Sequence, residues 1–233
     1  MSLKLKCLEI AFCSGIKLIE IYDTNLVSSY LGEKINLFIN NVPMLDKISI
    51  GEGYSVLEKD VFSQLSSCLY KLEILTLDIY RPEEHIKMFA FPELPNLEEL
   101  ILKLGAWNDD CLLEFTSLVR ACPNLYRFVV QLLWMSPSKK RRKIRPAAKC
   151  PHQYHKLVEI FGYYGRTSDD ELAMYFIENA IALQKVVIDP RCQILERSPI
   201  RNDQIKREEA AARNAAKKQL EAKRPSGVEL VIL

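Results

Sequence analysis

The stretch GYYGRTS, residues 162–168, contains residue types that could bind a phosphate, because glycines in front of a helix often form a phosphate cradle. A P-loop requires G-x-x-x-x-G-K-[ST], whereas Gly162 and Gly165 are three residues apart and no Lys-Ser or Lys-Thr follows. The carboxylates of residues 169–171 would also repel an anion at this helix start. The pattern therefore favours a structural turn over a phosphate site.

A second candidate site is the C-x-H-x-x-H pattern of Cys150, His152 and His155, whose side chains are typical zinc ligands. A structural zinc ion needs four ligands, usually from two paired knuckles. The one other histidine, His85, does not belong to a second pair. We therefore predict no metal site and assign these residues to a polar surface that leads into a strand.

The cysteines are seven in number and dispersed: Cys7, Cys13, Cys68, Cys111, Cys122, Cys150 and Cys192. Most of them lie in apolar runs, which is typical of small buried thiols in a reducing compartment. No catalytic signature marks any of them as a nucleophile with a neighbouring base. We predict that the chain is not an enzyme and binds no cofactor.

The run KKRRKIR, residues 139–145, places six basic residues in seven positions between Pro137 and Pro146. These residues are Lys139, Lys140, Arg141, Arg142, Lys143 and Arg145. Such a run is typical of a nuclear import signal or of a site for an acidic partner, and equally of a solvated insert in a loop. We predict no nucleic-acid partner, because no aromatic stacking platform accompanies the run and the net charge of the chain is only 32 − 30 = +2.

The composition is that of an ordinary globular protein, with 233 residues, of which 48% are hydrophobic and 27% charged. No window approaches the roughly 18 apolar residues of a membrane helix. The first residues alternate between apolar and polar side chains and so lack the apolar stretch of a signal peptide. We expect a cytoplasmic or nuclear protein with no membrane partner.

The elements that must position these residues follow a repeat, in which an apolar anchor precedes apolar residues three and five positions later. The anchors of its matches are Leu5, Ile16, Leu45, Leu72, Leu97 and Leu125. The last four are 27, 25 and 28 residues apart, which is the spacing and the L-x-x-L-x-L pattern of leucine-rich repeats. Alternation within each motif predicts a short strand. Because one repeat cannot bury its own apolar face, the strands should stack into the parallel sheet of an α/β leucine-rich-repeat solenoid.

Amphipathic segments should return the chain between the later strands. EKDVFSQLSSCL aligns Val61, Leu65, Cys68 and Leu69 on one face, and NDDCLLEFTSLVRAC aligns Leu112, Phe115, Val119 and Cys122. Asn108 or Asp109 is expected to cap the second of these helices. In the first third the anchors are only about ten residues apart. We therefore predict that NLVSSYLGEKINLFI forms short strands on alternating sides in place of helices.

One further repeat runs from LVEIFG to LQKVVI, whose anchors Leu157 and Leu183 are 26 residues apart. The pattern S-x-x-E from Ser168 to Glu171 predicts a capping box at the start of the intervening helix. Residues 201–227 predict an alanine-rich capping helix with a thin apolar stripe, and GVELVIL predicts a closing strand.

Three segments carry a resemblance to a known family. CPHQYHKLVEIFGYYGRTSDDELAMYFIENAIALQKVVIDPRCQ, residues 150–193, resembles the FBD domain of the plant F-box/LRR/FBD family. AKKQLEAKRPSGVELVIL resembles that family's C-terminal helix and last strand, and LKCLEIAFCSGIKLIEIYDTNLVSSYLG is similar to its short repeats. The resemblance implies leucine-rich repeats over 1–135, a basic loop or linker at 136–149, an FBD repeat at 150–193, and a C-terminal helix and strand at 194–233.

Members of this family usually begin with an F-box, a helical module that binds the Skp adaptor of a cullin ubiquitin ligase, whereas this sequence starts directly in the repeats. The resemblance implies the substrate-recognition part of an SCF-type ubiquitin ligase, with the Skp adaptor as a partner only where an F-box accompanies the chain. The alternative is an adaptor or decoy that binds a target protein without ubiquitinating it. The target protein itself is not named by the resemblance.

Target specificity is expected in the side chains that point away from the anchors. In LEELIL these are Glu98, Glu99 and Ile101, and in LYRFVV they are Tyr126, Arg127 and Val129. Trp107 and Trp134 follow the same two strands. Each tryptophan is interpreted either as packing at the sheet edge or as an exposed aromatic at a partner surface, where tryptophan is enriched.

Overall fold

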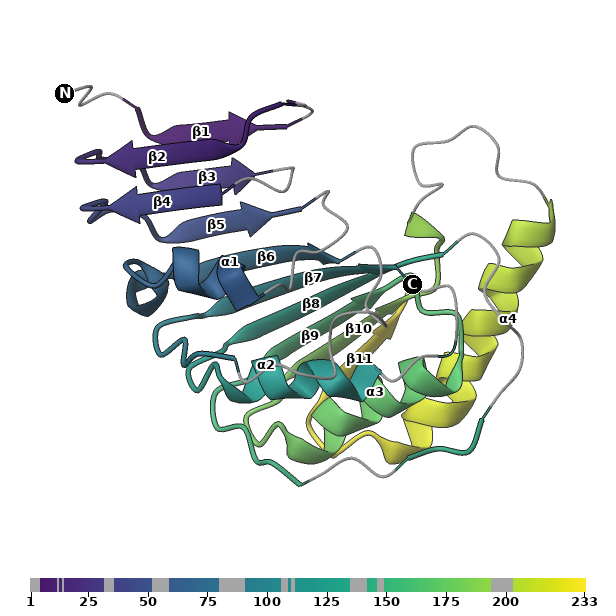
Figure 1. Cartoon of the computed structure of the whole chain (residues 1–233). Coiled ribbons are helices and arrows are strands. Elements are labelled where there is room, and N and C mark those ends of the chain that lie inside the picture. Colours follow the sequence, from purple (N-terminus) through teal and green to yellow (C-terminus); the bar gives the residue numbers. More distant parts are fainter. Residues whose placement is uncertain are drawn as a thin grey trace.

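The computed structural model describes residues 5–11, 13, 15–31, 36–51, 59–79, 91–105, 109, 112–134, 142–145, 149–193 and 203–233, except for the side chains of residues 59–61. A parallel sheet of nine strands runs through these residues in the order β1-β3-β5-β6-β7-β8-β9-β10-β11 (Figure 1). The strands are β1 (Cys7–Ile10), β3 (Ser28–Leu31), β5 (Lys47–Ile50), β6 (Ile74–Ile79), β7 (Glu99–Gly105), β8 (Arg127–Leu133), β9 (Leu157–Phe161), β10 (Lys185–Asp189) and β11 (Glu229–Ile232).

Helices cover one face of this sheet, and a second sheet of two strands continues the cover toward the N-terminus (Figure 1). The helices are α1 (Lys59–Gln64), α2 (Thr116–Arg120), α3 (Thr167–Asn179) and α4 (Asp203–Leu220), with 3-10 turns at Leu69–Lys71, Leu112–Phe115 and Glu221–Lys223. The second sheet pairs β2 (Leu18–Tyr22) with β4 (Asn36–Asn40) in parallel. Inward side chains of both sheets and of the helices belong to one hydrophobic core.

The predicted repeat is confirmed from β5 onward, because each motif forms a strand beside the previous one. The register aligns Ile48, Leu75, Leu100, Phe128 and Val158 in a single row across five strands. All five side chains are fully buried. Burying one such side chain contributes about 1.5–3 kcal/mol, so a row of this kind holds neighbouring strands in one register.

The first third contains short strands in place of helices, as predicted, but the two anchors found there belong to different sheets. The strand β1, anchored at Leu5, pairs with β3, whereas β2, anchored at Ile16, pairs with β4 on the opposite side of the core. Both sides show the same alternation because both are half-buried strands. The helix α1 lies beside β4, where Gln64 Oε1 accepts a hydrogen bond of 2.7 Å from the backbone N–H of Leu37.

The N-cap of the helix α3 lies two residues before Ser168, so Ser168 does not cap this helix as predicted. Arg166 is its N-cap residue, and the Asp169 carboxylate accepts hydrogen bonds from the backbone N–H groups of Arg166 (3.1 Å) and Tyr164 (2.9 Å). Glu171, the other half of the predicted box, binds a different partner, described below. Ala173, Phe176 and Ile177 form an apolar stripe on this helix and are buried.

The C-terminal prediction is confirmed. The helix α4 packs against α3 and β11, and the four side chains of its predicted stripe, Ile205, Ala212, Ala216 and Leu220, are buried. The closing strand β11 pairs in parallel with β10. Within the described residues, no helix is both long and apolar enough to cross a membrane.

Candidate protein-binding face

Three of the predicted partner-binding side chains, Glu99, Ile101 and Arg127, lie on the face of the main sheet that points away from the helices. The register aligns Thr76, Ile101, Val129, Glu159 and Val187 in one outward row across β6 to β10. Ile101 and Glu159 in this row are half-buried. The sequence analysis did not name Glu159, although the same alternation in LVEIFG predicts an outward side chain there.

Arg127 forms an ion-pair bridge across three strands in the centre of this face. Its Nη1 donates to Glu99 Oε1 at 2.9 Å on β7, and its Nε donates to Glu159 Oε2 at 2.6 Å on β9. Burial alone would lower the pKa of Arg127, but the hydrogen bonds and charges of Glu159 and Glu99 outweigh burial and raise that pKa. The guanidinium therefore stays charged and is held in one orientation, as an arginine between two carboxylates should be.

Val129 points outward as predicted, yet it is buried and offers no contact area to a partner. Only 3% of its surface is accessible, although it is not part of the hydrophobic core cluster. Its cover comes from the same face, because Ile101 and Glu159 flank it on the neighbouring strands and Arg127 precedes it by two residues. The outward face is thus a packed surface with a small apolar centre.

Glu98 and Tyr126 are exposed, but they lie just before the strands and not on the face itself. The backbone carbonyl of Glu98 accepts hydrogen bonds from Tyr126 (2.8 Å) and Arg127 (2.9 Å), so the two residues are neighbours on one ladder. Tyr126 is 46% exposed, and the Lys156 ammonium lies 5.3 Å from the centroid of its ring. The predicted partner-binding residues therefore divide into a central group on the face and a flanking pair at the leading edge of the strands.

Trp134 is fully buried, so the expectation of an exposed aromatic at a partner surface is wrong for this residue. Its indole Nε1 donates a hydrogen bond of 2.6 Å to the backbone carbonyl of Gly162. Gly162 has φ 74°, and a Cβ there would lie 2.2 Å from the carbonyl oxygen of Leu132. The glycine turn that resembled a phosphate cradle thus packs against Trp134. Trp107 lies outside the described residues.

Comparisons with known proteins decide the family. A profile of the family described as "At1g61320/AtMIF1, LRR domain" matches residues 1–233, the whole chain. This chain belongs to that leucine-rich-repeat family. The putative F-box/FBD/LRR-repeat protein At5g22610 of Arabidopsis thaliana is 28% identical over 117 residues, which are 48% of this chain and 23% of that protein.

These matches confirm the predicted relationship to plant F-box/FBD/LRR proteins and indicate a protein-interaction module. The aligned region covers less than a quarter of the length of the relative. No solved structure gives a significant match.

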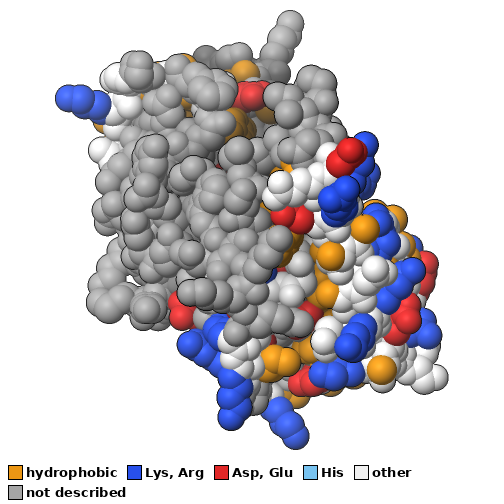
Figure 2. All heavy atoms as spheres, turned by 90° about the vertical axis from the view of Figure 1, so that its right-hand side faces the viewer, with side chains coloured by type: hydrophobic (Ala, Val, Ile, Leu, Met, Phe, Trp, Pro, Cys, Tyr) orange, Lys and Arg blue, Asp and Glu red, His pale blue; other side chains and the backbone are white. Residues whose placement is uncertain are grey.

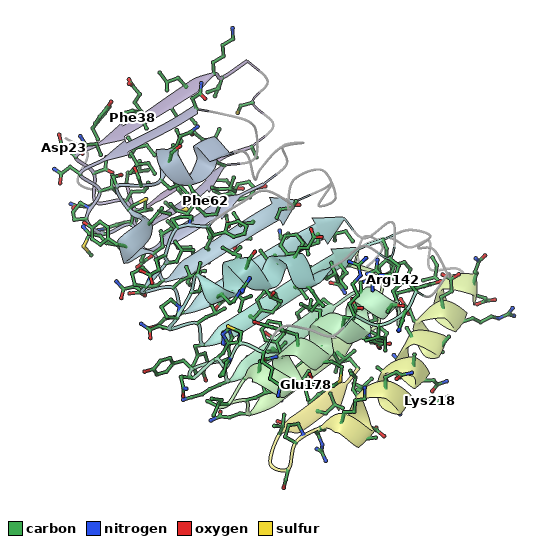
Figure 3. All side chains as sticks on the ribbon, turned by 60° about the horizontal axis from the view of Figure 1, so that its bottom comes forward. Asp23, Phe38, Phe62, Arg142, Glu178 and Lys218 are labelled. Atoms are coloured by element: carbon green, nitrogen blue, oxygen red, sulfur yellow. The ribbon has the colours of Figure 1, made fainter. Side chains whose placement is uncertain are left out.

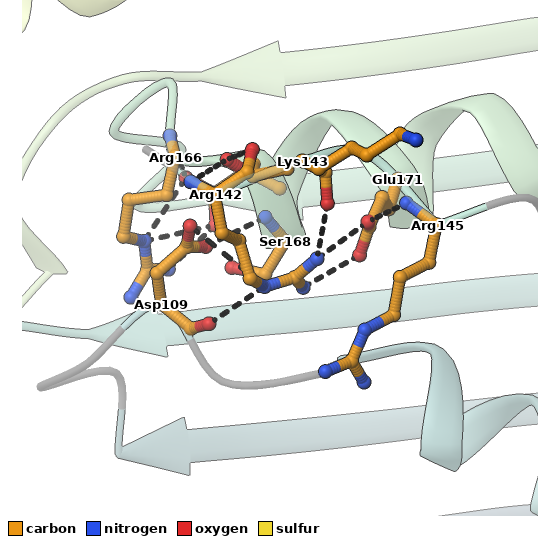
Figure 4. A network of polar contacts seen from close by, with 9 residues as sticks. Asp109, Arg142, Lys143, Arg145, Arg166, Ser168 and Glu171 are labelled. Atoms are coloured by element: carbon orange, nitrogen blue, oxygen red, sulfur yellow. Dashed lines mark hydrogen bonds and ion pairs between the residues drawn. The ribbon is translucent and has the colours of Figure 1, made fainter. Parts of the chain in front are cut away.

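Part of the basic run of this LRR domain has a structural role. Arg142 forms a bidentate ion pair with Glu171 of α3, with both N–O distances at 2.6 Å (Figure 4). The backbone N–H of Arg145 donates to the same carboxylate at 2.5 Å. Lys143 and Arg145 are exposed, and Lys139, Lys140 and Arg141 lie outside the described residues. Arg142 is therefore an anchor of the loop, and the nuclear-signal prediction for the run is untested.

Asp109 was predicted to cap the helix that follows it, whereas the described bond of its carboxylate runs to the start of α3 (Figure 4). Its Oδ1 accepts a hydrogen bond of 2.8 Å from the backbone N–H of Ser168, 59 residues away in the chain. Burial raises the pKa of Asp109, but the bonds from Ser168 and Thr167 and the charge of Arg142 outweigh burial and lower that pKa overall. The carboxylate stays charged, which stabilises the N-terminus of a helix.

Cys150, His152 and His155 precede β9, but the assignment of the two histidines to a polar surface is wrong, because both are buried. His152 Nε2 lies 2.6 Å from the hydroxyl of Tyr175, and the rings of His152 and His155 are 4.5 Å apart. Both ring nitrogens of His155 are buried without a hydrogen-bond partner, and burial lowers the pKa of His155 to about 3. Among the described side chains no cluster of three or more could hold a metal ion.

The buried cysteines have environments that suppress nucleophilic chemistry. Burial raises the pKa of Cys68 to about 11 and that of Cys122 to about 12. A thiol reacts as a thiolate, so neither side chain is a nucleophile near neutral pH.

Proposed function

We propose that this LRR domain binds a target protein through the outward face of β7, β8 and β9, centred on Arg127. The observation that carries the proposal is the bridge from Glu99 through Arg127 to Glu159, which fixes three charged groups on adjacent strands. A charged group already held in position loses little conformational entropy when a partner binds. The half-buried side chains of Ile101 and Leu157 beside the bridge supply apolar contact area.

The mechanism is placement of a bound protein and not a chemical reaction. Charged groups of fixed position favour partners with complementary charges and penalise others, so the bridge would provide specificity while its apolar neighbours provide affinity. We further propose that the stacked repeats form a leucine-rich-repeat solenoid, and that residues 150–193 are its FBD repeat. The protein would act in the cytoplasm or the nucleus, without catalytic activity of its own.

The likeness to the Arabidopsis relative, whose name includes an F-box, supports a finer proposal. In it, this domain is the substrate-recognition part of an SCF-type ubiquitin ligase, and the bound target is presented for ubiquitination. The Skp adaptor would be a partner through an F-box joined to this domain.

The binding face is tested with two matched variants. Ile101→Arg places a long charged side chain on the face, and Leu18→Arg makes the same change at an exposed position of the second sheet. Each purified domain is immobilised and incubated with plant extract, and captured proteins are quantified by mass spectrometry. We expect at least one plant protein whose captured amount is unchanged with Leu18→Arg and falls about tenfold or more with Ile101→Arg. If both variants capture every protein equally, the face is not the docking surface.

The ligase role is tested with the native protein from plant tissue. Immunoprecipitation with an antibody against this domain should recover the Skp adaptor together with the target, and inhibition of the proteasome should raise the abundance of the target. Recovery of the target without the adaptor, and without any change in target abundance, would contradict the ligase role and support the decoy function.

A further inference from the structure

A groove lies on the helical side of the molecule, between α3, the end of α4 and the loop that carries the basic run. Its volume is about 660 Å³. The two helices that flank the groove can be found in Figure 3, where Glu178 is labelled on α3 and Lys218 on α4. The groove is lined by Ile144, Arg145, Lys149, Pro151, Met174, Glu178, Ile181, Gln219 and Lys223, with Asp170, Glu171, Tyr175 and Asn179 beneath them.

Polar bonds hold both walls of the groove in place. On one side, Glu171 binds Arg142 and the backbone of Arg145, which fixes Ile144 between them. On the other side, Asn179 Oδ1 accepts a hydrogen bond of 2.7 Å from the backbone of Cys150. The backbone N–H of Ile181 donates to the carbonyl of His152 at 2.9 Å. The groove is therefore formed before a ligand arrives, which lowers the entropic cost of binding.

The groove is apolar where a ligand side chain would enter. Ile144 is 53% exposed and Ile181 is 64% exposed, and the half-buried Met174 of α3 also lines the groove. Large aliphatic side chains that share one concave surface are typical of a docking site. Methionine adds a flexible contact that adapts to different partners.

The rim of the groove is basic. Arg145, Lys149 and Lys223 are exposed around it, whereas Glu178 is the one exposed carboxylate among its lining residues. The two other lining carboxylates are already engaged, because Glu171 pairs with Arg142 and Asp170 accepts a hydrogen bond from the hydroxyl of Tyr163. Figure 2 shows the side of the molecule on which α4 lies, where basic, acidic and apolar side chains lie next to one another.

We propose that this groove binds an acidic amphipathic segment of a partner protein, separately from the sheet face. Leucine-like side chains of the segment enter between Ile144 and Ile181, and its carboxylates meet the basic rim. A groove with large apolar side chains at its entrance and a charged rim suits an amphipathic helix, whose apolar face enters while its charged face meets the rim. A nucleic acid fits less well, because the one aromatic lining residue, Tyr175, is 2% exposed and offers no surface for base stacking.

The test uses a fluorescent synthetic peptide with Leu at every third or fourth position and Glu elsewhere, so that its helix has one apolar and one acidic face. Binding to the full chain is followed by fluorescence anisotropy. The double variant Lys149→Glu/Lys223→Glu should bind the peptide roughly tenfold more weakly, because two attractive charges become repulsive. Ile181→Ser should also weaken binding, because it removes half of the apolar entrance.

The matched control is Lys47→Glu/Lys217→Glu, which changes the net charge equally at exposed positions outside the groove. Lys217 precedes Gln219 by two residues, so it lies about 200° around α4 from the groove. The proposal expects this control, and Ile101→Arg on the sheet face, to bind as the unaltered chain does. The proposal would be overturned if the control variant weakened peptide binding equally, or if an all-Glu peptide bound as tightly as the amphipathic one. It would also be overturned if single-stranded RNA bound more tightly than the peptide and Lys149→Glu/Lys223→Glu abolished that binding.

Discussion

Two arginines of this domain each form ion pairs that join separate segments. A comparison of the two shows how burial changes the role of an arginine–carboxylate pair. Arg127 lies on the outward sheet face, where its side chain is 35% exposed and its partners Glu99 and Glu159 also contact solvent. Arg142 lies on the helical side and pairs with Glu171, which is fully buried. The first pair is available to a partner protein, whereas the second holds a loop onto a helix.

The energetic difference follows from the solvent. A partly exposed ion pair contributes little to stability, because water and salt screen its charges. A buried carboxylate that loses its partner costs several kcal/mol, because the remaining charge is left desolvated. We therefore expect a variant of the Arg142 bridge to lose more stability, and a variant of the Arg127 bridge to lose more target binding.

The largest expected effect belongs to the buried bridge. Arg142→Ala leaves Glu171 buried without its cation and should lower the free energy of unfolding by about 3 kcal/mol. Chemical denaturation followed by circular dichroism measures this loss. Lys143→Ala, an exposed neighbour on the same loop, is the control and should change stability by less than about 0.5 kcal/mol. An equally mild effect of Arg142→Ala would show that the loop is held by other contacts.

The next effect depends on pH and also comes from the helical side. The pKa of His155 is 6.5 when unfolded and about 3 when folded, so the folded state binds fewer protons between these values. The contribution of neutral His155 to the free energy of unfolding is therefore fully present well above pH 6.5, and it is lost as the pH falls below that value. One proton accounts for a loss of roughly 2 kcal/mol between pH 7 and pH 5.

Urea denaturation at several pH values measures this dependence, and His155→Leu should flatten it. His155→Leu also removes two buried polar atoms that lack partners, so it should not destabilise the domain at pH 7. If the free energy of unfolding depended on pH in the same way in His155→Leu, a group other than His155 would be responsible for that dependence.

A smaller effect is expected at the junction between the two sides. Trp134→Phe removes the hydrogen bond to Gly162 and part of the packing, and should cost about 1.5 kcal/mol. The same thermal or chemical denaturation measures it. Because the indole is buried, capture of the target protein should not change. Weaker target capture at unaltered stability would instead restore the interpretation of this tryptophan as a partner-binding residue.

The smallest effect on stability is expected at the exposed bridge. Arg127→Ala should lower the free energy of unfolding by at most about 1 kcal/mol, while reducing capture of the target severalfold. Denaturation and the capture experiment measure the two quantities on the same preparation. A stability loss as large as that of Arg142→Ala would mean that the sheet-face bridge is structural, and the comparison would fail.

Some features of the fold could be predicted from the sequence because they depend on local periodicity. Leu45, Leu72, Leu97 and Leu125 each precede a strand of the main sheet, and the thin stripe of α4 is buried. The outward placement of Glu99, Ile101 and Arg127 follows from the same alternation of side chains. These predictions needed only the period of a strand or a helix.

Other features were not predictable, because they involve residues far apart in the chain. Asp109 was assigned to its own helix, yet it binds Ser168 across 59 residues. For Trp134 the sequence left packing at the sheet edge and exposure at a partner surface both open, because the carbonyl that it binds belongs to Gly162 in the next repeat. Arg142 stands in a run that resembles a solvated loop, and only the position of α3 brings Glu171 to it.

By itself the sequence determined the repeat, the strands, their inward leucines and the family, because apolar periodicity is a local property that burial then enforces. The tertiary structure alone decided which charged and aromatic side chains are buried, how the outward side chains pair on the sheet face, and which segments form the groove. The physical reason is that the desolvation of a polar group depends on every segment packed around it. Those segments come from separate repeats, whose contacts exist only after folding.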